Sequence, residues 1–192
     1  GTSKVASVPR AFLDITGHKK EEDRLKGATF AELRLWESES LSKVQKVWIK
    51  TAAPAPVTLV KLAEDNKAKL PAGWYIDPPS ARSVADDRKV TRFLRGLMTI
   101  RPQDRMDPKG SGYGLDTLVL SAAIETKEED GATRAYRMDL SFVTAPEKAV
   151  YAQMFPSQEI YRIREQSIAD INKDIVEIAQ NKKFFLKTSG KK

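Results

Sequence analysis

The stretch that decides the fold runs from Trp74 to Ile100 and reads WYIDPPSARSVADDRKVTRFLRGLMTI. Its first residues, Trp74–Ile76, are aromatic or β-branched and favour a short strand. The segment 77–80 contains two consecutive prolines, which stop a strand and turn the chain. A helix is predicted to follow from about Asp86, because Asp86 or Ser83 can cap its first amides and Arg101-Pro102 ends it. The stretch therefore predicts a strand, a stiff corner and a helix.

The predicted helix has two chemically distinct faces. At the α-helical period, one face is apolar and comprises Val90, Phe93, Leu94, Leu97, Met98 and Ile100. The opposite face carries Arg88, Arg92 and Arg95. Burial of each apolar side chain contributes on the order of 1.5–3 kcal/mol, which is more than a surface arginine contact contributes. We therefore expect packing of the apolar face to fix this helix.

A similar unit recurs later in the chain. Alternating apolar residues predict strands over 118–124 and 134–142, and Asp130-Gly131 suits the tight turn between them. A further hairpin is predicted around Pro156-Ser157, and Ser167 is expected to cap a last helix. The apolar stripe of that helix comprises Ile168, Ile171, Ile175 and Ile178, whereas Lys173, Asp174 and Glu177 are expected to face water.

These patterns predict an α+β fold made of two related halves, each consisting of antiparallel strands followed by a packing helix. We expect residues 1–28 to form a flexible or irregular leader and residues 29–108 to form the first half. Residues 109–186 are expected to form the second half, and residues 187–192 a flexible tail. The glycine-rich segment Lys109–Gly114 is interpreted as the linker between the halves.

Composition bounds the class of protein. The 192 residues can bury one full core, and the absence of cysteine excludes disulfides and thiolate chemistry. No apolar run approaches the ~18 residues that a membrane-spanning helix needs. The chain begins with Gly1 rather than Met, which suggests a processed or engineered fragment, so any upstream signal peptide or membrane anchor would have been removed from view.

The residue types that enzymes commonly use are sparse. His18 is the single histidine and falls in the irregular leader, so neither a Ser-His-Asp triad nor a histidine metal site is expected. Glu128, Glu129 and Asp130 cluster at a hairpin tip, where a solvated turn is expected instead of acid–base chemistry. The segment Gly110–Gly114 lacks the flanking strand, helix and Gly-Lys-Ser/Thr of a phosphate loop. We predict no catalytic residue, cofactor, metal or small-molecule substrate.

The net charge of +7 draws attention to the basic residues of the first helix. The candidate partner-binding residues are Arg82, Arg88, Lys89, Arg92, Arg95 and Arg101. Such a surface is compatible with an acidic protein, with anionic lipid headgroups or with nucleic acid, and equally with a merely solvated helix face. Nucleic acid is the least favoured of these ligands, because no aromatic side chains alternate with the basic ones.

Several segments together resemble the bacterial domain of unknown function 4340. The matching features are Ala28–Leu33, Val44–Ile49, Val57–Lys61, Gly73–Ile76, the 84–87 segment with Val90, Leu94 and Leu97, Tyr113–Asp116, Val150-Tyr151 and Ile160–Ile163. The resemblance covers about Ala28 to Leu186 and rests on dispersed aliphatic and aromatic positions. It implies an extracytoplasmic domain anchored to the bacterial inner membrane by an amino-terminal helix that this sequence does not contain. It also implies proximity to auxiliary subunits of gliding-motility-type ABC transporters, and it brings no catalytic residues.

We therefore expect a non-enzymatic interaction domain that accompanies an ABC-transporter or gliding-type membrane complex and binds a protein of that complex. The alternative is a domain that binds nucleic acid or another anionic polymer through the basic helix face. The two hypotheses differ in salt dependence, since binding that releases counterions from nucleic acid weakens steeply as salt rises.

Overall fold

A computed structural model describes residues 41–52, 55–65, 70–77, 83–144, 148–181 and 183–187. The predicted leader, His18, the Ala28–Leu33 segment and Arg82 lie outside these residues, as does the predicted tail apart from Lys187. The described strands are β1 (Val44–Thr51), β2 (Val57–Leu62), β3 (Gly73–Ile76), β4 (Ser83–Val84), β5 (Pro102–Met106), β6 (Leu118–Lys127), β7 (Thr133–Val143), β8 (Ala149–Phe155) and β9 (Ile160–Ile163). The helices are α2 (Asp87–Met98) and α3 (Ala169–Gln180), with 3₁₀ turns η2 (Leu41–Lys43) and η3 (Glu165–Ile168).

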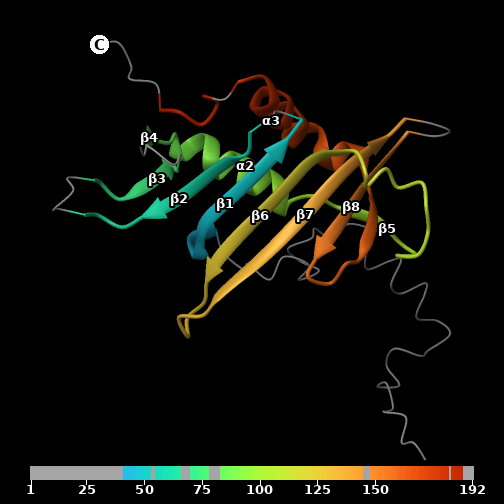
Figure 1. Ribbon diagram of the computed structural model, residues 1–192, viewed down its shortest axis with the longest axis horizontal. Helices are drawn as coiled ribbons and strands as arrows, with labels where there is room; N and C mark the ends of the chain where they lie inside the picture. Colours follow the sequence, from blue (N-terminus) through green and yellow to red (C-terminus); the bar gives the residue numbers. More distant parts are fainter. Residues whose placement is uncertain are drawn as a thin grey trace, which may run out of the picture.

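The strands form one nine-stranded sheet in the order β4-β3-β2-β1-β6-β7-β8-β9-β5, and every neighbouring pair is antiparallel (Figure 1). The prediction of an α+β fold with two related halves is therefore wrong, because the molecule is mainly a single β-sheet. Two pairings join the segments that were assigned to separate halves. Strand β1 pairs with β6, with Val47 opposite Ile124, and β5 pairs with β9 at the far edge.

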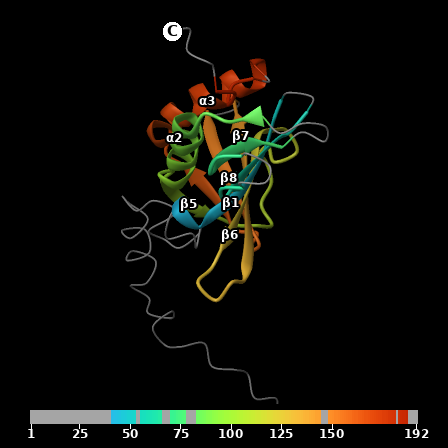
Figure 2. The same cartoon turned by 90° about the vertical axis from the view of Figure 1, so that its left-hand side faces the viewer.

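Both helices lie on the same face of the sheet (Figures 1 and 2). Their apolar stripes enter one continuous core with the inward side chains of the central strands, so Leu94 and Ile175 are buried as the sequence predicted. Helix α2 begins as expected, since the Asp86 carboxylate accepts hydrogen bonds from the Arg88 and Lys89 amides. Two α-helices therefore cover one face of the sheet instead of one helix closing each half.

The segment between β5 and β6 crosses the sheet. It leaves the β5 edge and returns to the centre, so it does not link two halves. The Tyr113 ring in this segment lies 5.0 Å from the Tyr151 ring of β8, tilted by 53°, and the Tyr113 carbonyl accepts a hydrogen bond from the Ser141 hydroxyl of β7. Gly114 adopts φ +64°, and a Cβ atom there would lie 3.0 Å from Val143 Cγ2. Only glycine satisfies both the backbone conformation and this close approach.

The end of the described chain closes the opposite edge of the sheet. After α3, the Phe185 carbonyl accepts the Asp86 amide, and the Lys187 amide donates to the Val84 carbonyl beside β4. Phe184 and Phe185 are both buried, and the Phe185 ring meets Phe93 of α2 edge-on at 5.8 Å. These contacts join the chain end to the first helix and to the β4 edge.

The start of α3 differs from the prediction. The helix begins at Ala169, and its N-cap residue, Ile168, offers no side-chain hydrogen bond. Ser167 lies instead in the preceding 3₁₀ turn, where its hydroxyl donates to the Arg164 carbonyl and accepts the Arg101 amide. The expected cap is wrong because Ser167 lies in the 3₁₀ turn, one residue before the N-cap position of α3.

Candidate functional site: a groove between the two helices

An open groove of about 750 Å³ runs between α2 and α3, and most of the residues that line it are exposed. Its lining is mostly polar and charged. The residues from α2 and its ends are Asp87, Arg88, Thr91, Arg92, Arg95, Gly96 and Thr99, and those from η3 and α3 are Ser167, Ile171, Lys173, Asp174 and Glu177. Three of the candidate basic residues, Arg88, Arg92 and Arg95, thus line one concave surface.

The floor of the groove is the point where the helices meet. A Cβ atom at Gly96 would lie 3.3 Å from the Cβ of Ile171, closer than most side-chain contacts in proteins. The absence of a side chain at Gly96 therefore lets α3 approach the backbone of α2. Arg92 and Arg95, which precede Gly96 in α2, also line the groove and are exposed to solvent.

Arg92 and Asp174 form a two-pronged ion pair across the groove. Arg92 donates from Nε to Asp174 Oδ2 at 3.2 Å and from Nη2 to Oδ1 at 2.5 Å. The Asp174 side chain is 6% exposed and the Arg92 side chain 59% exposed, so the carboxylate is buried beneath the guanidinium. The sequence prediction that Asp174 faces water is therefore wrong, because Arg92 from the other helix covers it.

The ion pair also fixes the charge of Arg92. The hydrogen bond to Asp174 raises the pKa of Arg92, and the opposing effect of burial is smaller. Because folding raises the pKa of Arg92, its charge stabilises the folded protein fully at pH values below the ordinary arginine pKa. This stabilisation is lost only as the pH rises through the raised pKa. Arg92 is thus a permanent cation throughout the range in which proteins are usually studied.

Arg88 and Arg95 differ from Arg92, because their side chains have no partner in the part of the chain that the structure describes. Both side chains are exposed, and within the described residues neither forms an ion pair or a side-chain hydrogen bond. They lie about one helical turn before and after Arg92, so the three guanidinium groups follow one stripe of α2. Lys173 adds an exposed cation from the α3 side of the groove.

The remaining candidate basic residues do not line the groove. Lys89 turns toward the chain end, where its Nζ donates to the Phe184 carbonyl at 2.7 Å and lies 5.0 Å from the centre of the Phe184 ring. Arg101 is exposed just before β5, and its backbone amide donates to Ser167. Arg82 lies outside the described residues. Of the described candidate residues, Arg88, Arg92 and Arg95 therefore line the groove, whereas Lys89 and Arg101 do not.

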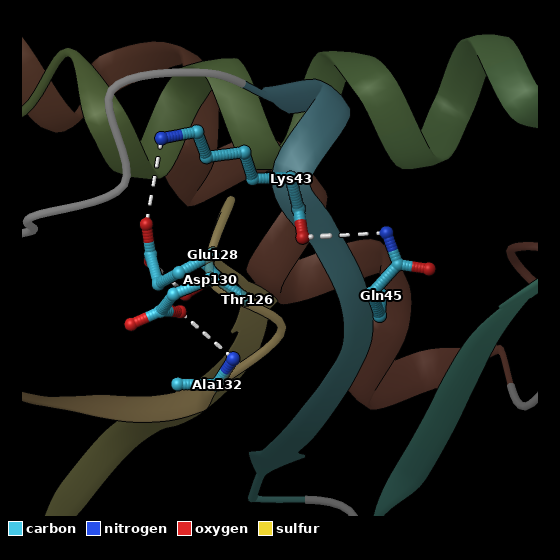
Figure 3. A network of polar contacts seen from close by, with 6 residues as sticks. All are labelled: Lys43, Gln45, Thr126, Glu128, Asp130 and Ala132. Atoms are coloured by element: carbon cyan, nitrogen blue, oxygen red, sulfur yellow. Dashed lines mark hydrogen bonds and ion pairs between the residues drawn. The ribbon is translucent and has the colours of Figure 1, made fainter.

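The acidic hairpin tip between β6 and β7 is a stabilised turn (Figure 3). Glu128 pairs with Lys43 of η2 at 3.4 Å and accepts the Thr126 hydroxyl at 3.0 Å, while Asp130 accepts the Ala132 amide at 2.9 Å. These carboxylates are therefore engaged in local contacts. Among the described residues, no group of histidine, cysteine or acidic side chains is arranged to hold a metal ion.

Sequence reasoning missed the half of the groove that α3 contributes. The available signal was the polar face of α3, which comprises Lys173, Asp174 and Glu177. Their proximity to the arginines of α2 could not be predicted, because it depends on how the two helices pack. Asp87 was also missed. Its carboxylate accepts a hydrogen bond of 3.1 Å from the Trp74 amide of β3, a contact that depends on how α2 packs beside that strand. These acidic residues balance part of the positive charge.

Comparisons with protein-family models, with curated proteins and with solved structures find no match to this chain. Neither α2 nor α3, at 12 residues each, is long and apolar enough to cross a membrane, and no other described helix is.

Proposed function

We propose that the protein is a non-enzymatic interaction domain that binds an acidic segment of a partner protein in the groove between α2 and α3. The observation that carries this proposal is the stripe of three guanidinium groups, of which Arg88 and Arg95 are exposed and unpaired within the described residues. An exposed cation without a counterion is free to pair with a carboxylate of another molecule. Arg92, lying between them, is already held in place.

The charge pattern of the groove favours a protein over nucleic acid. Asp87 and Glu177 line the same groove as the arginines, and they would repel a continuous row of phosphates. Stacking platforms for bases are absent from the groove lining, which contains no aromatic residue. A protein segment can instead place a carboxylate beside the arginines and a neutral residue beside Glu177.

The resemblance to the bacterial domain of unknown function 4340 supports a more specific proposal. It favours a domain held outside the cytoplasm and a partner within an ABC-transporter or gliding-type membrane complex. This part of the proposal rests on that resemblance, whereas the groove argument rests on contacts between named residues.

The proposal can be tested with a short peptide of alternating Glu and Ser at about 0.15 M ionic strength, where exposed charges are screened beyond about 8 Å. Binding is expected for the parent protein and is expected to be lost when Arg88→Glu and Arg95→Glu are combined. A control that combines Lys50→Glu and Lys127→Glu changes the net charge equally on exposed residues of the sheet and should bind normally.

Two further probes separate the alternatives. Duplex DNA and vesicles that contain anionic lipid are expected to bind more weakly than the peptide under the same conditions. The proposal is overturned if the parent does not bind the peptide, or if both charge-reversal pairs weaken binding equally. Preferential binding of DNA, lost in the Arg88 and Arg95 variant, would instead establish the anionic-polymer alternative.

A further inference from the structure

The Arg92 guanidinium retains unused hydrogen-bond donors. Its Nε and one Nη2 hydrogen point at Asp174, so both hydrogens of Nη1 and the other hydrogen of Nη2 remain. One Nη1 hydrogen and the free Nη2 hydrogen lie along the end of the planar guanidinium, in the geometry that a carboxylate accepts through two parallel hydrogen bonds. With 59% of the side chain exposed, this end of Arg92 is accessible from the groove.

We infer that Asp174 is a positioning residue, which holds Arg92 so that the free end of its guanidinium binds a single Asp or Glu carboxylate of the partner segment. The inference rests on the proposed function and specifies how the groove recognises its ligand. Binding would depend on a fixed fork of hydrogen-bond donors as well as on positive charge. An unrestrained arginine side chain loses rotamer entropy when it binds a ligand. Because Asp174 already restricts the rotamers of Arg92, less entropy is lost when the partner carboxylate binds.

The neighbouring arginines explain how an already paired guanidinium attracts a second carboxylate. Asp174 neutralises the charge of Arg92. Arg92 alone would therefore present correctly placed hydrogen-bond donors but would attract a second carboxylate only weakly. Arg88 and Arg95 supply the missing positive charge from either side, and Lys173 supplies it from α3. Besides Asp174, the acidic residues Asp87 and Glu177 line the groove and Asp86 acts on Arg92 from the start of α2, and their presence limits the site to a ligand of low charge.

The decisive comparison is between Asp174→Asn and Glu177→Gln, each of which removes one negative charge from the groove. A purely electropositive groove would bind the Glu-Ser peptide more tightly in both variants. The positioning role predicts opposite results. Glu177→Gln should strengthen binding slightly, and Asp174→Asn should weaken it by about tenfold, the size of one lost charge-assisted hydrogen bond.

Arg92→Lys provides a second test that does not remove the buried carboxylate. Lysine keeps the charge and can still pair with Asp174, but it cannot present a second planar fork. Peptide binding should again fall by about tenfold. A direct readout is the set of NMR signals from the Arg92 Nη1 and Nη2 hydrogens, which should shift when peptide is added to the parent.

The outcomes separate this inference from the proposed function. If the Arg88 and Arg95 reversal abolishes binding while Asp174→Asn and Arg92→Lys bind as tightly as the parent, the groove binds acidic segments but the positioning role is wrong. Arg92 Nη hydrogen signals that are unmoved by saturating peptide also overturn the positioning role. If the parent fails to bind the peptide, the proposed function itself falls. Thermal unfolding of each variant shows that the folded protein is being measured.

Discussion

Gly96 of α2 packs against Ile171 of α3, since a Cβ atom at Gly96 would lie 3.3 Å from the Cβ of Ile171. Replacement by alanine brings two opposed effects. Helix propensity improves by roughly 0.5–1 kcal/mol, whereas the added methyl group crowds Ile171. We expect Gly96→Ala to change the free energy of unfolding by less than about 1 kcal/mol. Gly96→Val adds bulk at the contact and should destabilise by about 1–3 kcal/mol.

Denaturant unfolding of the two Gly96 variants checks this prediction. A valine variant as stable as the alanine variant would show that α2 and α3 do not meet at this position. Because Gly96 also lines the groove, the valine variant should bind the acidic peptide more weakly as well.

Phe185 is expected to contribute strongly to stability, although it lies near the end of the chain. Its ring is buried against Phe93 and Phe184, and its carbonyl accepts the Asp86 amide. Phe185→Ala should lower the free energy of unfolding by about 3–5 kcal/mol. Lys183→Ala, at an exposed position of the same segment, should change it by less than about 0.5 kcal/mol. Equal effects would mean that the chain end is not part of the core.

Gly112 and Gly114 form a matched pair in the crossing segment. Both have positive φ angles, but a Cβ atom at Gly112 would meet nothing within 4 Å, whereas one at Gly114 would lie 3.0 Å from Val143. Alanine at Gly112 should cost about 1 kcal/mol of backbone strain. Alanine at Gly114 should cost about 1–3 kcal/mol more, because Val143 must also move. Chemical denaturation would refute the proposed contact if the two variants were equally stable.

Removal of Arg92 should leave Asp174 buried without its partner. Arg92→Ala is expected to destabilise by about 1–3 kcal/mol, a range kept low because Arg92 is largely exposed and solvent can reach the carboxylate. Arg88→Ala removes an unpaired arginine from the same helix face and should change the stability by less than about 0.5 kcal/mol. Thermal unfolding distinguishes the two variants, and identical melting temperatures would argue against the ion pair.

Local patterns in the sequence predicted most of the individual elements. Alternation identified β6 and β7, and the apolar stripe around Leu94 identified α2, because these signals depend on residues close in sequence. Strand β5 was missed, since its Gln103-Asp104-Arg105 segment is polar and starts after a proline, as suits an edge strand. Edge strands carry little hydrophobic periodicity by which to recognise them.

The arrangement of the elements was not predictable in the same way. The pairing of Val47 with Ile124 joins residues that are far apart in the chain, and nothing in either strand specifies its partner. The same limit applies to the groove. The three arginines of α2 were identified by helical spacing, but the burial of Asp174 depends on how α3 packs against α2.

The groove as a binding surface is tested most directly by amide chemical-shift mapping of the isotope-labelled protein during titration with the Glu-Ser peptide. We predict that the largest shifts fall on Arg88, Arg92 and Arg95 of α2 and on Lys173 and Glu177 of α3. Saturating shifts confined to this set would support the proposed function. Shifts centred on the opposite face of the sheet, around Trp48 and Phe155, or no shifts at all, would contradict it.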